Sequence, residues 1–283
     1  MIILQVLNGL VYGSLLMIMT SGLVLIYGLR RIVNFAHGSL YMLGAYVGYT
    51  VSLYVNPWFA MAAAAAVLAV GGFLLDRYGF RYLQDRDPLT TVIVTYGLLL
   101  ILEDVVQSFW GKTNYTMDAP AILQGSVDLL GTSFPFYRLS IIIAGVLITG
   151  GLLLWLRFSR MGLFIRAAST DPVTTAMQGV NTDRISGGVV ALGAALAGVA
   201  GVIAAPFLSL SPTMGSDILI DSFVVVVIGG LGSFGGAFIA AMIVGQIQTM
   251  GSVYLPEYAA LLPFCLMLAV LIGKPSGIAG SRV

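Results

Sequence analysis

Apolar stretches long enough to cross a lipid bilayer make up most of this 283-residue chain. A bilayer core of about 30 Å needs about 20 apolar residues of helix. This criterion predicts spans at Leu4–Tyr27, His37–Val55, Pro57–Leu75, Leu89–Phe109, Arg138–Leu156, Ile185–Leu208 and Tyr254–Gly273. Only 9% of the residues are charged, against about 25% in soluble domains. The sequence therefore predicts an all-α polytopic transmembrane helical bundle that forms a single domain over residues 1–283.

One further apolar stretch, Ile218–Gly251, is interrupted by glycines. Its first piece, Ile218–Ile228, would be about 16 Å of helix and too short to cross a bilayer alone. We therefore expect two short pieces that meet at a break within the membrane, so that the chain has about eight membrane segments. Broken backbone is tolerated at this depth where it is buried in protein or lines a wet cavity. A substrate pathway is one interpretation and a glycine kink for close helix packing is the other; the candidate pathway residues are Gly229, Gly230, Gly232, Ser233 and Gly235.

Small residues four positions apart recur along the predicted spans. They are Gly9 and Gly13, Gly44 and Gly48, the series Gly193, Ala197 and Gly201, and Gly232 with Gly236. Such spacing puts small residues on one helix face and lets two helix backbones approach closely in lipid. We expect helix packing at these positions.

Orientation follows from the placement of lysine and arginine, which favour cytoplasmic loops. Three alternate loops and the tail hold most of the cationic residues, namely Arg30, Arg31, Arg77, Arg81, Arg86, Arg157, Arg160, Arg166, Arg184, Lys274 and Arg282. The opposite connections carry Asp118, Asp128, Asp217 and Asp221. The pattern predicts basic loops and a C-terminus in the cytoplasm and an N-terminus outside. Because the N-terminus lacks a basic n-region and a small-residue cleavage site, we expect the first apolar stretch to be kept as a span.

The segment from Arg157 to Arg184 is the most polar part of the chain, with four arginines and two aspartates. Aspartate is a good N-cap and proline is tolerated in the first helical turn, so Asp171-Pro172 predicts the start of a helix. That helix would cover about two turns from Val173 and end at Gly179. A short helix in a basic loop suits a cytosolic partner, whereas an ordinary solvated loop is the alternative.

Residues suited to catalysis or metal binding are few. His37 is the single histidine and Cys265 the single cysteine, so neither has companions for a metal site. No local motif supports a Ser/His/Asp triad, and a net charge of +1 without a basic run gives no indication of nucleic-acid binding. The composition and motifs disfavour an enzyme.

Polar residues near predicted spans remain as candidates for a pathway. Asn34 and His37 precede the second span, where they either anchor the chain at the interface or face a wet interior and line a path. Glu103 and Asp104 lie late in the fourth span, near its outer end. Carboxylates in membrane segments usually face a bundle interior, although this pair fits the headgroup region equally well.

Five separated motifs resemble one known family. They are Asn8-Gly9-Leu10-Val11-Tyr12-Gly13-Ser14, Leu25-Ile26-Tyr27-Gly28-Leu29, the stretch from Val33 to Tyr46 that contains Asn34-Phe35-Ala36-His37-Gly38, the glycine-rich Gly229-Gly230-Leu231-Gly232-Ser233-Phe234-Gly235-Gly236-Ala237, and the tail Lys274-Pro275-Ser276-Gly277-Ile278-Ala279-Gly280. Together they resemble the smaller permease type of the branched-chain amino acid ABC importers. The resemblance covers nearly the whole chain in the same order. One departure is Ser39, which stands where the family often has an acidic residue and joins the candidate pathway residues.

The resemblance implies a heteromeric importer in a bacterial or archaeal inner membrane. Its partners would be a second permease, two cytosolic ATPases that use ATP and Mg²⁺, and an extracytoplasmic binding protein that delivers a small-molecule substrate. This chain would bind no cofactor and catalyse no reaction. The family's coupling segment matches Arg166, Ala167, Asp171, Ala176, Gly179 and Val180. Branched-chain or other hydrophobic amino acids are the expected substrates; a permease for urea or amides, or an ion-coupled secondary carrier, is the alternative.

Overall fold

The computed structural model describes residues 2–84, 86–129 and 131–280; Arg282, counted above in the cationic tail, lies outside this part. Seven helices in the described residues are long and apolar enough to cross a membrane, which confirms the all-α polytopic bundle. They are α1 (Ile2–Arg30), α3 (Pro57–Leu75) continued by the π-helical turn η1 (Asp76–Phe80) and α4 (Arg81–Leu83), α5 (Pro88–Trp110), α6 (Phe136–Phe158), α9 (Thr182–Leu208), α11 (Phe234–Tyr254), and the 3₁₀ turn η3 (Pro256–Leu261) continued by α12 (Leu262–Gly273).

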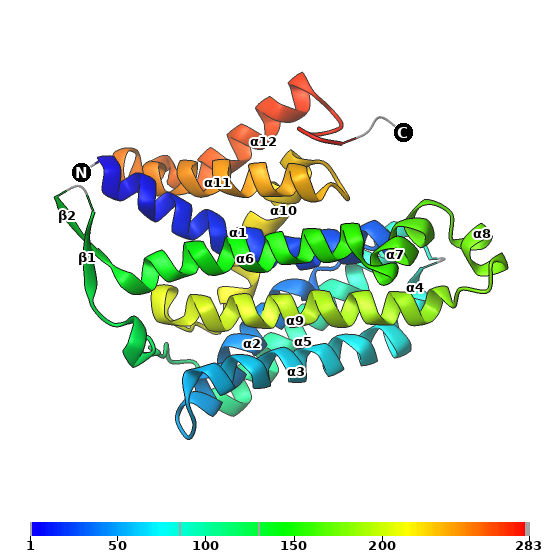
Figure 1. Cartoon of the computed structure of the whole chain (residues 1–283), viewed down its shortest axis with the longest axis horizontal. Helices are drawn as coiled ribbons and strands as arrows, with labels where there is room; N and C mark the ends of the chain where they lie inside the picture. Colours follow the sequence, from blue (N-terminus) through cyan, green and yellow to red (C-terminus); the bar gives the residue numbers. More distant parts are fainter. Residues whose placement is uncertain (1, 85, 130, 281–283) are drawn as a thin grey trace.

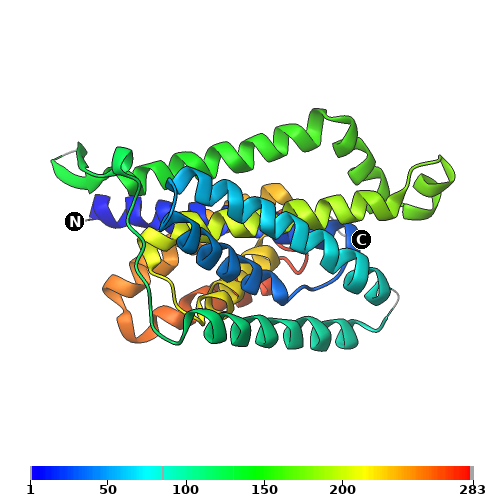
Figure 2. The same ribbon diagram turned by 90° about the horizontal axis from the view of Figure 1, so that it is seen from below.

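The bundle is elongated, and α1, α3, α6, α9 and α11 run along its length (Figures 1 and 2). The N-terminus lies at one end beside a hairpin of β1 (Ser126–Leu129) and β2 (Thr132–Pro135), which we call the hairpin end. The same connection contains the 3₁₀ turn η2 (Ala121–Leu123). At the opposite end, called the α8 end, α7 (Arg160–Thr170) follows α6, and α8 (Pro172–Met177) extends beyond the other helices.

Two shorter helices, α2 (Ala36–Ser52) and α10 (Met214–Gly229), occupy the interior. The His37 ring donates through Nε2 to the Met19 carbonyl at 3.1 Å, and Met19 lies within about one turn of the middle of α1. The first turn of α2 therefore lies near mid-bundle, and the chain reaches it through the non-helical residues 31–35. Because Gly38 packs directly on Gly215, α10 also begins near mid-bundle.

Close backbone packing holds α2 against α9, as the small-residue spacing predicts. A Cβ atom on Gly44 would come within 2.2 Å of the Gly198 Cα, and one on Gly201 within 2.1 Å of the Tyr41 carbonyl oxygen. Only glycine permits these separations. The core sits around α1, whose side chains from Ser14 to Ile26 are all buried.

The predicted break in the stretch from Ile218 to Gly251 is present, but its geometry differs from the expectation. Residues 230–233 separate α10 from α11, and α11 alone is long enough to span. The break lies beside Gly28 near the end of α1, so it is toward the α8 end rather than midway through the bundle. The length of the apolar stretch does not reveal the depth of the break, because the non-helical residues 209–213 bring the chain back to mid-bundle before α10 begins.

The placement of Asp217 and Asp221 in a connection is wrong. Both lie inside α10. Asp217 does so because this helix starts at Met214, four residues before the apolar stretch that marked it in the sequence, and Asp221 falls within that stretch.

Candidate functional site

The basic segment folds into two capped helices at the α8 end. The Ser159 hydroxyl accepts a hydrogen bond from the Gly162 amide at 2.9 Å and caps α7. The Asp171 carboxylate accepts from the amides of Val173 and Thr174, both at 3.0 Å, and caps α8. The helix predicted after Asp171-Pro172 is confirmed; it ends at Met177, shortly before Gly179 in the left-handed region with φ 82°.

The Asp171 carboxylate is stabilised in its ionised form. The Thr174 hydroxyl donates to Oδ2 at 2.5 Å, in addition to the two amide bonds to Oδ1. These bonds, that of the Thr174 hydroxyl first, lower the pKa of Asp171 from its ordinary value of 3.8. The carboxylate is thus charged at neutral pH, and its negative charge interacts favourably with the positive N-terminal end of the α8 dipole.

Apolar side chains project from α8 into the surroundings. Val173 is 62% exposed and Met177 is 80% exposed, while Thr175 is the one buried residue of this helix. Of the other predicted coupling residues, Ala176 and Gly179 are exposed and Val180 packs against the buried side chains at the start of α9. The helix is therefore an exposed protrusion that is fixed at its base.

A close contact fixes α7 to the end of α6. A Cβ atom on Gly162 would come within 2.0 Å of the Leu156 carbonyl oxygen, so only glycine fits here. The Arg166 guanidinium donates a hydrogen bond to the same carbonyl, which would otherwise lack a partner at a helix C-terminus. Arg166 thus holds α7 in place, whereas Ala167 is exposed.

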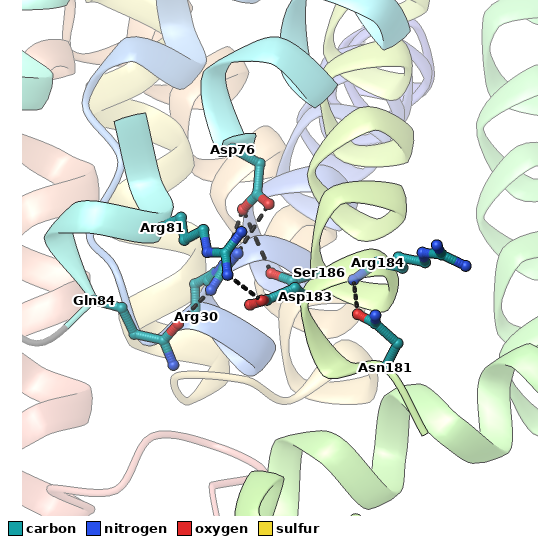
Figure 3. Close-up of polar contacts among 8 residues, drawn as sticks. All are labelled: Arg30, Asp76, Arg81, Gln84, Asn181, Asp183, Arg184 and Ser186. Carbon is teal, nitrogen blue, oxygen red and sulfur yellow. Dashed lines mark hydrogen bonds and ion pairs between the residues drawn. The ribbon is translucent and has the colours of Figure 1, made fainter. Parts of the chain in front are cut away.

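A polar cluster, here called the junction network, lies where the end of the basic segment meets the ends of α1, η1 and α9 (Figure 3). The Arg30 guanidinium, at the end of α1, donates to both carboxylate oxygens of Asp76 at 2.9 and 2.8 Å. It also donates to Gln84, and the Ser186 hydroxyl of α9 donates to Asp76 at 3.4 Å. The side chains of Arg30 and Asp76 are each 4% exposed, so a complete ion pair is buried where α1, η1 and α9 meet.

The outer part of the junction network is exposed. Arg81 pairs with Asp183 at 2.7 Å, with 55% and 47% of their side chains exposed. The Asn181 side chain accepts from the Arg184 amide at 2.9 Å and caps α9 (Figure 3). The sequence predicts cytoplasmic loops for these arginines but does not reveal the network; its one signal is Asp76, a carboxylate at the end of an otherwise apolar span.

The candidates at the start of α2 lie together in the interior. Asn34, His37 and Ser39 are fully buried. Within the described residues the side-chain amide of Asn34 and Nδ1 of His37 have no hydrogen-bond partner. The Ser39 hydroxyl donates to the Leu99 carbonyl at 3.4 Å, a long hydrogen bond. Their burial shows that they face the protein interior, and a role in a pathway stays a prediction.

A second polar group lies on α10 and its neighbours. The Tyr12 hydroxyl of α1 donates to the Asp221 carboxylate at 2.5 Å, and the Ser216 hydroxyl donates to Glu103 of α5. Tyr12 is about one turn from the middle of α1 and Glu103 about one turn from the middle of α5. Glu103 thus lies away from the helix end in a half-buried position, and Asp217 is exposed on the surface of this single chain.

The candidate pathway glycines between α10 and α11 lie apart from both polar groups. Gly229 packs on Gly236, and the tail closes over the break, because Ile278 and Ala279 donate their amides to the carbonyls of residues 228 and 229 at 2.8 and 3.1 Å. Ser233 caps α11 through the Gly236 amide at 3.2 Å. Gly230 and Gly232 have φ of 99° and 85°, and Gly235 has open space around its Cα.

No group of three or more His, Cys, Asp or Glu side chains in the described residues is arranged to hold a metal ion. The arrangement contains instead a membrane-length bundle, an exposed capped helix at one end, and buried polar groups near its middle. A family model described as branched-chain amino acid transport system, permease component, matches residues 5–271. The chain belongs to this family.

Individual relatives agree with this assignment. The chain is 30% identical to the high-affinity branched-chain amino acid transport system permease protein LivH of Salmonella typhimurium, over 98% of this chain and 94% of the relative. It is 29% identical to BraD of Pseudomonas aeruginosa, with the same description, over 98% and 95%. The ribose import permease protein RbsC of Escherichia coli is 28% identical over 83% and 71%. No solved structure matches the chain.

Family membership makes this chain a multi-pass membrane protein and a permease subunit of a transport system, not an enzyme. The predicted resemblance and fold class are confirmed. The roles of individual residues in coupling and in the pathway stay predictions.

Proposed function

We propose that this chain is one of two permease subunits of an ATP-driven importer and that it moves branched-chain or other hydrophobic amino acids. Two ATPase subunits would use ATP and Mg²⁺, and a binding protein would deliver the substrate from outside. The observation that carries the proposal is the exposure of α8. This helix has a capped N-terminus, and its apolar side chains Val173 and Met177 project from the bundle. The permease relatives of branched-chain amino acid systems support the substrate class.

Coupling would occur through α8. An amphipathic or apolar helix that fits a groove on a partner is a common recognition mode, and the two exposed apolar side chains provide the contact. The base of α8 is held by Arg166 on one side and by the junction network on the other. A push on α8 would therefore move the ends of α1, α6 and α9 together.

The pathway would pass the polar groups near mid-bundle. A carboxylate at membrane depth is costly against lipid and faces protein or a wet cavity. The α10 face with Asp217 and Asp221 is open on the single chain, so we assign it to the side that meets the second permease and the substrate. The carboxylates suit the substrate ammonium group, and the buried Asn34 offers an unpaired amide to its polar end.

The α8 end would face the cytoplasm, because nearly all arginines gather there. Single cysteines at Gln178→Cys and Gln124→Cys, in a Cys265→Ser background, report the two ends of the bundle. A membrane-impermeant maleimide added to intact cells should label position 124 and not position 178. Labelling of position 178 alone would reverse the orientation.

The coupling proposal is tested by co-purification in mild detergent from the native host. Wild type should retain an ATPase and a second permease. The double variant Val173→Asp/Met177→Asp, which leaves the Asp171 cap intact, should lose the ATPase and keep the permease. The matched control Val127→Asp, at the hairpin end, should keep both. An ATPase that stays bound to the double variant would contradict coupling through α8.

Transport is tested with the purified complex in proteoliposomes. Uptake of labelled leucine should require ATP on the side of the membrane that the α8 end faces and the binding protein on the opposite side. Uptake by this chain alone, without an ATPase, would instead favour a secondary carrier. Uptake of ribose or urea but not leucine would keep the permease function and overturn the substrate class.

A further inference from the structure

A cavity of 650 Å³ lies at the α8 end, between α1, α6, α7 and the start of α11. Its walls are mostly aliphatic, with Leu25, Leu153 and Ile165 among them, and its only polar side chains are Arg157, Arg166 and Ser169. No carboxylate lines it. A mostly apolar cavity with cationic groups at one side suits an anionic amphiphile and does not suit a free polar metabolite.

The cavity reaches the exposed surface of α6. Exposed apolar side chains of this helix form a stripe at helical spacing, Ile143, Leu147, Leu154 and Phe158. Leu154 is 59% exposed and also lines the cavity. Because the same side chain belongs to the exposed apolar stripe and to the cavity wall, the cavity opens at this surface, which would face the bilayer in a membrane-spanning bundle.

The two arginines are free to bind an anion. In the described part of the chain the ion pairs join Arg30 to Asp76 and Arg81 to Asp183, so Arg157 and Arg166 form none. The Arg157 guanidinium lies over the Phe158 ring at 5.6 Å from its centroid. One N–H of Arg166 is held by the Leu156 carbonyl, which fixes the side chain and leaves its other donors available.

The depth of these groups matches a membrane interface. Arg157 is the penultimate residue of α6 and Arg30 is the last residue of α1. Leu25 and Leu153 lie about one turn or slightly more inside those helix ends. The charged side of the cavity is thus at headgroup level and the aliphatic side at the level of the first acyl methylenes.

We propose that this cavity binds an anionic phospholipid, with its phosphate between Arg157 and Arg166 and its acyl chains against Leu25, Leu153 and Leu154. Guanidinium groups bind phosphate through charge-assisted hydrogen bonds, and basic pockets between transmembrane helices bind anionic headgroups. The lipid would bridge α6 and α7 at the base of the segment that carries α8. This site is independent of the proposed substrate.

Two substitutions test the proposal in different ways. Arg157→Gln removes one phosphate ligand, and Arg160→Gln is its matched control, because Arg160 is on the same segment and does not line the cavity. Gly28→Leu fills the cavity: Gly28 lines it, and a Cβ atom there meets no atom within 4 Å, so the side chain has room. Gly97→Leu, also with nothing within 4 Å, is the control on α5.

The measurement is native mass spectrometry of the full-length protein in detergent, titrated with phosphatidylglycerol or phosphatidylcholine of identical acyl chains. Wild type, Arg160→Gln and Gly97→Leu should prefer phosphatidylglycerol. Arg157→Gln should lower this preference about fivefold, as expected for one arginine near a membrane surface. Gly28→Leu should reduce retention of phosphatidylglycerol, and added inorganic phosphate should not displace it.

Three results would overturn the proposal. One is equal retention of the two lipids by wild type. Another is an equal loss in Arg157→Gln and Arg160→Gln, which would indicate general surface charge. The third is unchanged retention in Gly28→Leu when thermal unfolding shows that the variant is folded, because the added side chain takes space that the acyl chains would occupy.

Discussion

Breaking the buried ion pair of Arg30 and Asp76 should destabilise this protein much more than breaking the exposed pair of Arg81 and Asp183. The two pairs lie in the same junction network and have similar N–O distances, 2.8 and 2.7 Å. They differ in burial, since the side chains are 4% exposed in the first pair and about half exposed in the second. Removing one partner of a buried pair costs about 3–5 kcal/mol, whereas an exposed pair contributes about 0.2–1 kcal/mol.

The structure explains why the remaining partners do not compensate. In Arg30→Gln the Asp76 carboxylate keeps only the Ser186 hydroxyl, at 3.4 Å, as a hydrogen-bond donor from this network. A charge left in a buried site without its counter-ion must either take up a proton or admit water. In Arg81→Gln, solvent already reaches the Asp183 side chain.

The assay is equilibrium unfolding in mixed detergent–SDS micelles, followed by tryptophan fluorescence. Arg30→Gln and Asp76→Asn should each lower the free energy of unfolding by about 3–5 kcal/mol. The double variant should lose less than the sum of the two, because each single change removes the same interaction. Equal effects of Arg30→Gln and Arg81→Gln, or strict additivity in the double variant, would refute this reasoning.

Three further predictions concern the helix cap, the packing and the interior. The pKa of Asp171 is lowered in the folded state, so its stabilisation of α8 is complete above the ordinary carboxyl range and is lost as pH falls through the lowered pKa. Hydrogen exchange of the α8 amides should therefore be faster in Asp171→Asn than in wild type at neutral pH. This difference should vanish in strong acid. Gly44→Val, which forces a side chain against α9, should destabilise the bundle by about 1–3 kcal/mol in the same unfolding assay, whereas Gly97→Val has open space and should change little. Tyr12→Phe removes the donor to Asp221 and should lower leucine uptake at normal expression; unchanged uptake would separate this pair from the pathway.

Much of the fold follows from hydropathy and small-residue spacing. The long helices are set by apolar length, and α1, α5, α6, α9 and the helix that ends at Gly273 match predicted spans within a few residues. The helix from Pro57 continues past the predicted end at Leu75 to Leu83, and α11 was expected as part of a broken segment rather than as a full span. Packing at Gly44 and Gly201 follows from geometry that the sequence displays directly. The helix after Asp171 was predictable because its cap and its proline are local signals that need no tertiary partner.

The interior could not be predicted in the same way. An apolar stretch of about 19 residues from His37 fits a full span, yet the chain enters the bundle before this helix begins, and only the contact of His37 with Met19 reveals the depth. Asp221 looked like part of a connection because it adjoins other polar residues, and its partner Tyr12 is 209 positions away. Arg30 and Asp76 were each visible, but their pairing depends on how α1 and η1 pack.

The short helices explain why the polar groups gather where they do. A helix that begins inside a bundle leaves its first amides without intrahelical partners, and at membrane depth such groups need protein or water around them. Both α2 and α10 begin there without a side-chain cap, next to Asn34 and the carboxylates of α10. In the proposed pathway a solute at this level would exchange part of its hydration for these polar groups, which the apolar faces of α3, α6 and α12 do not provide. If α8 transmits a conformational change as proposed, that change would be most effective where it alters the contact between α2 and α10, which rests on the direct approach of Gly38 to Gly215.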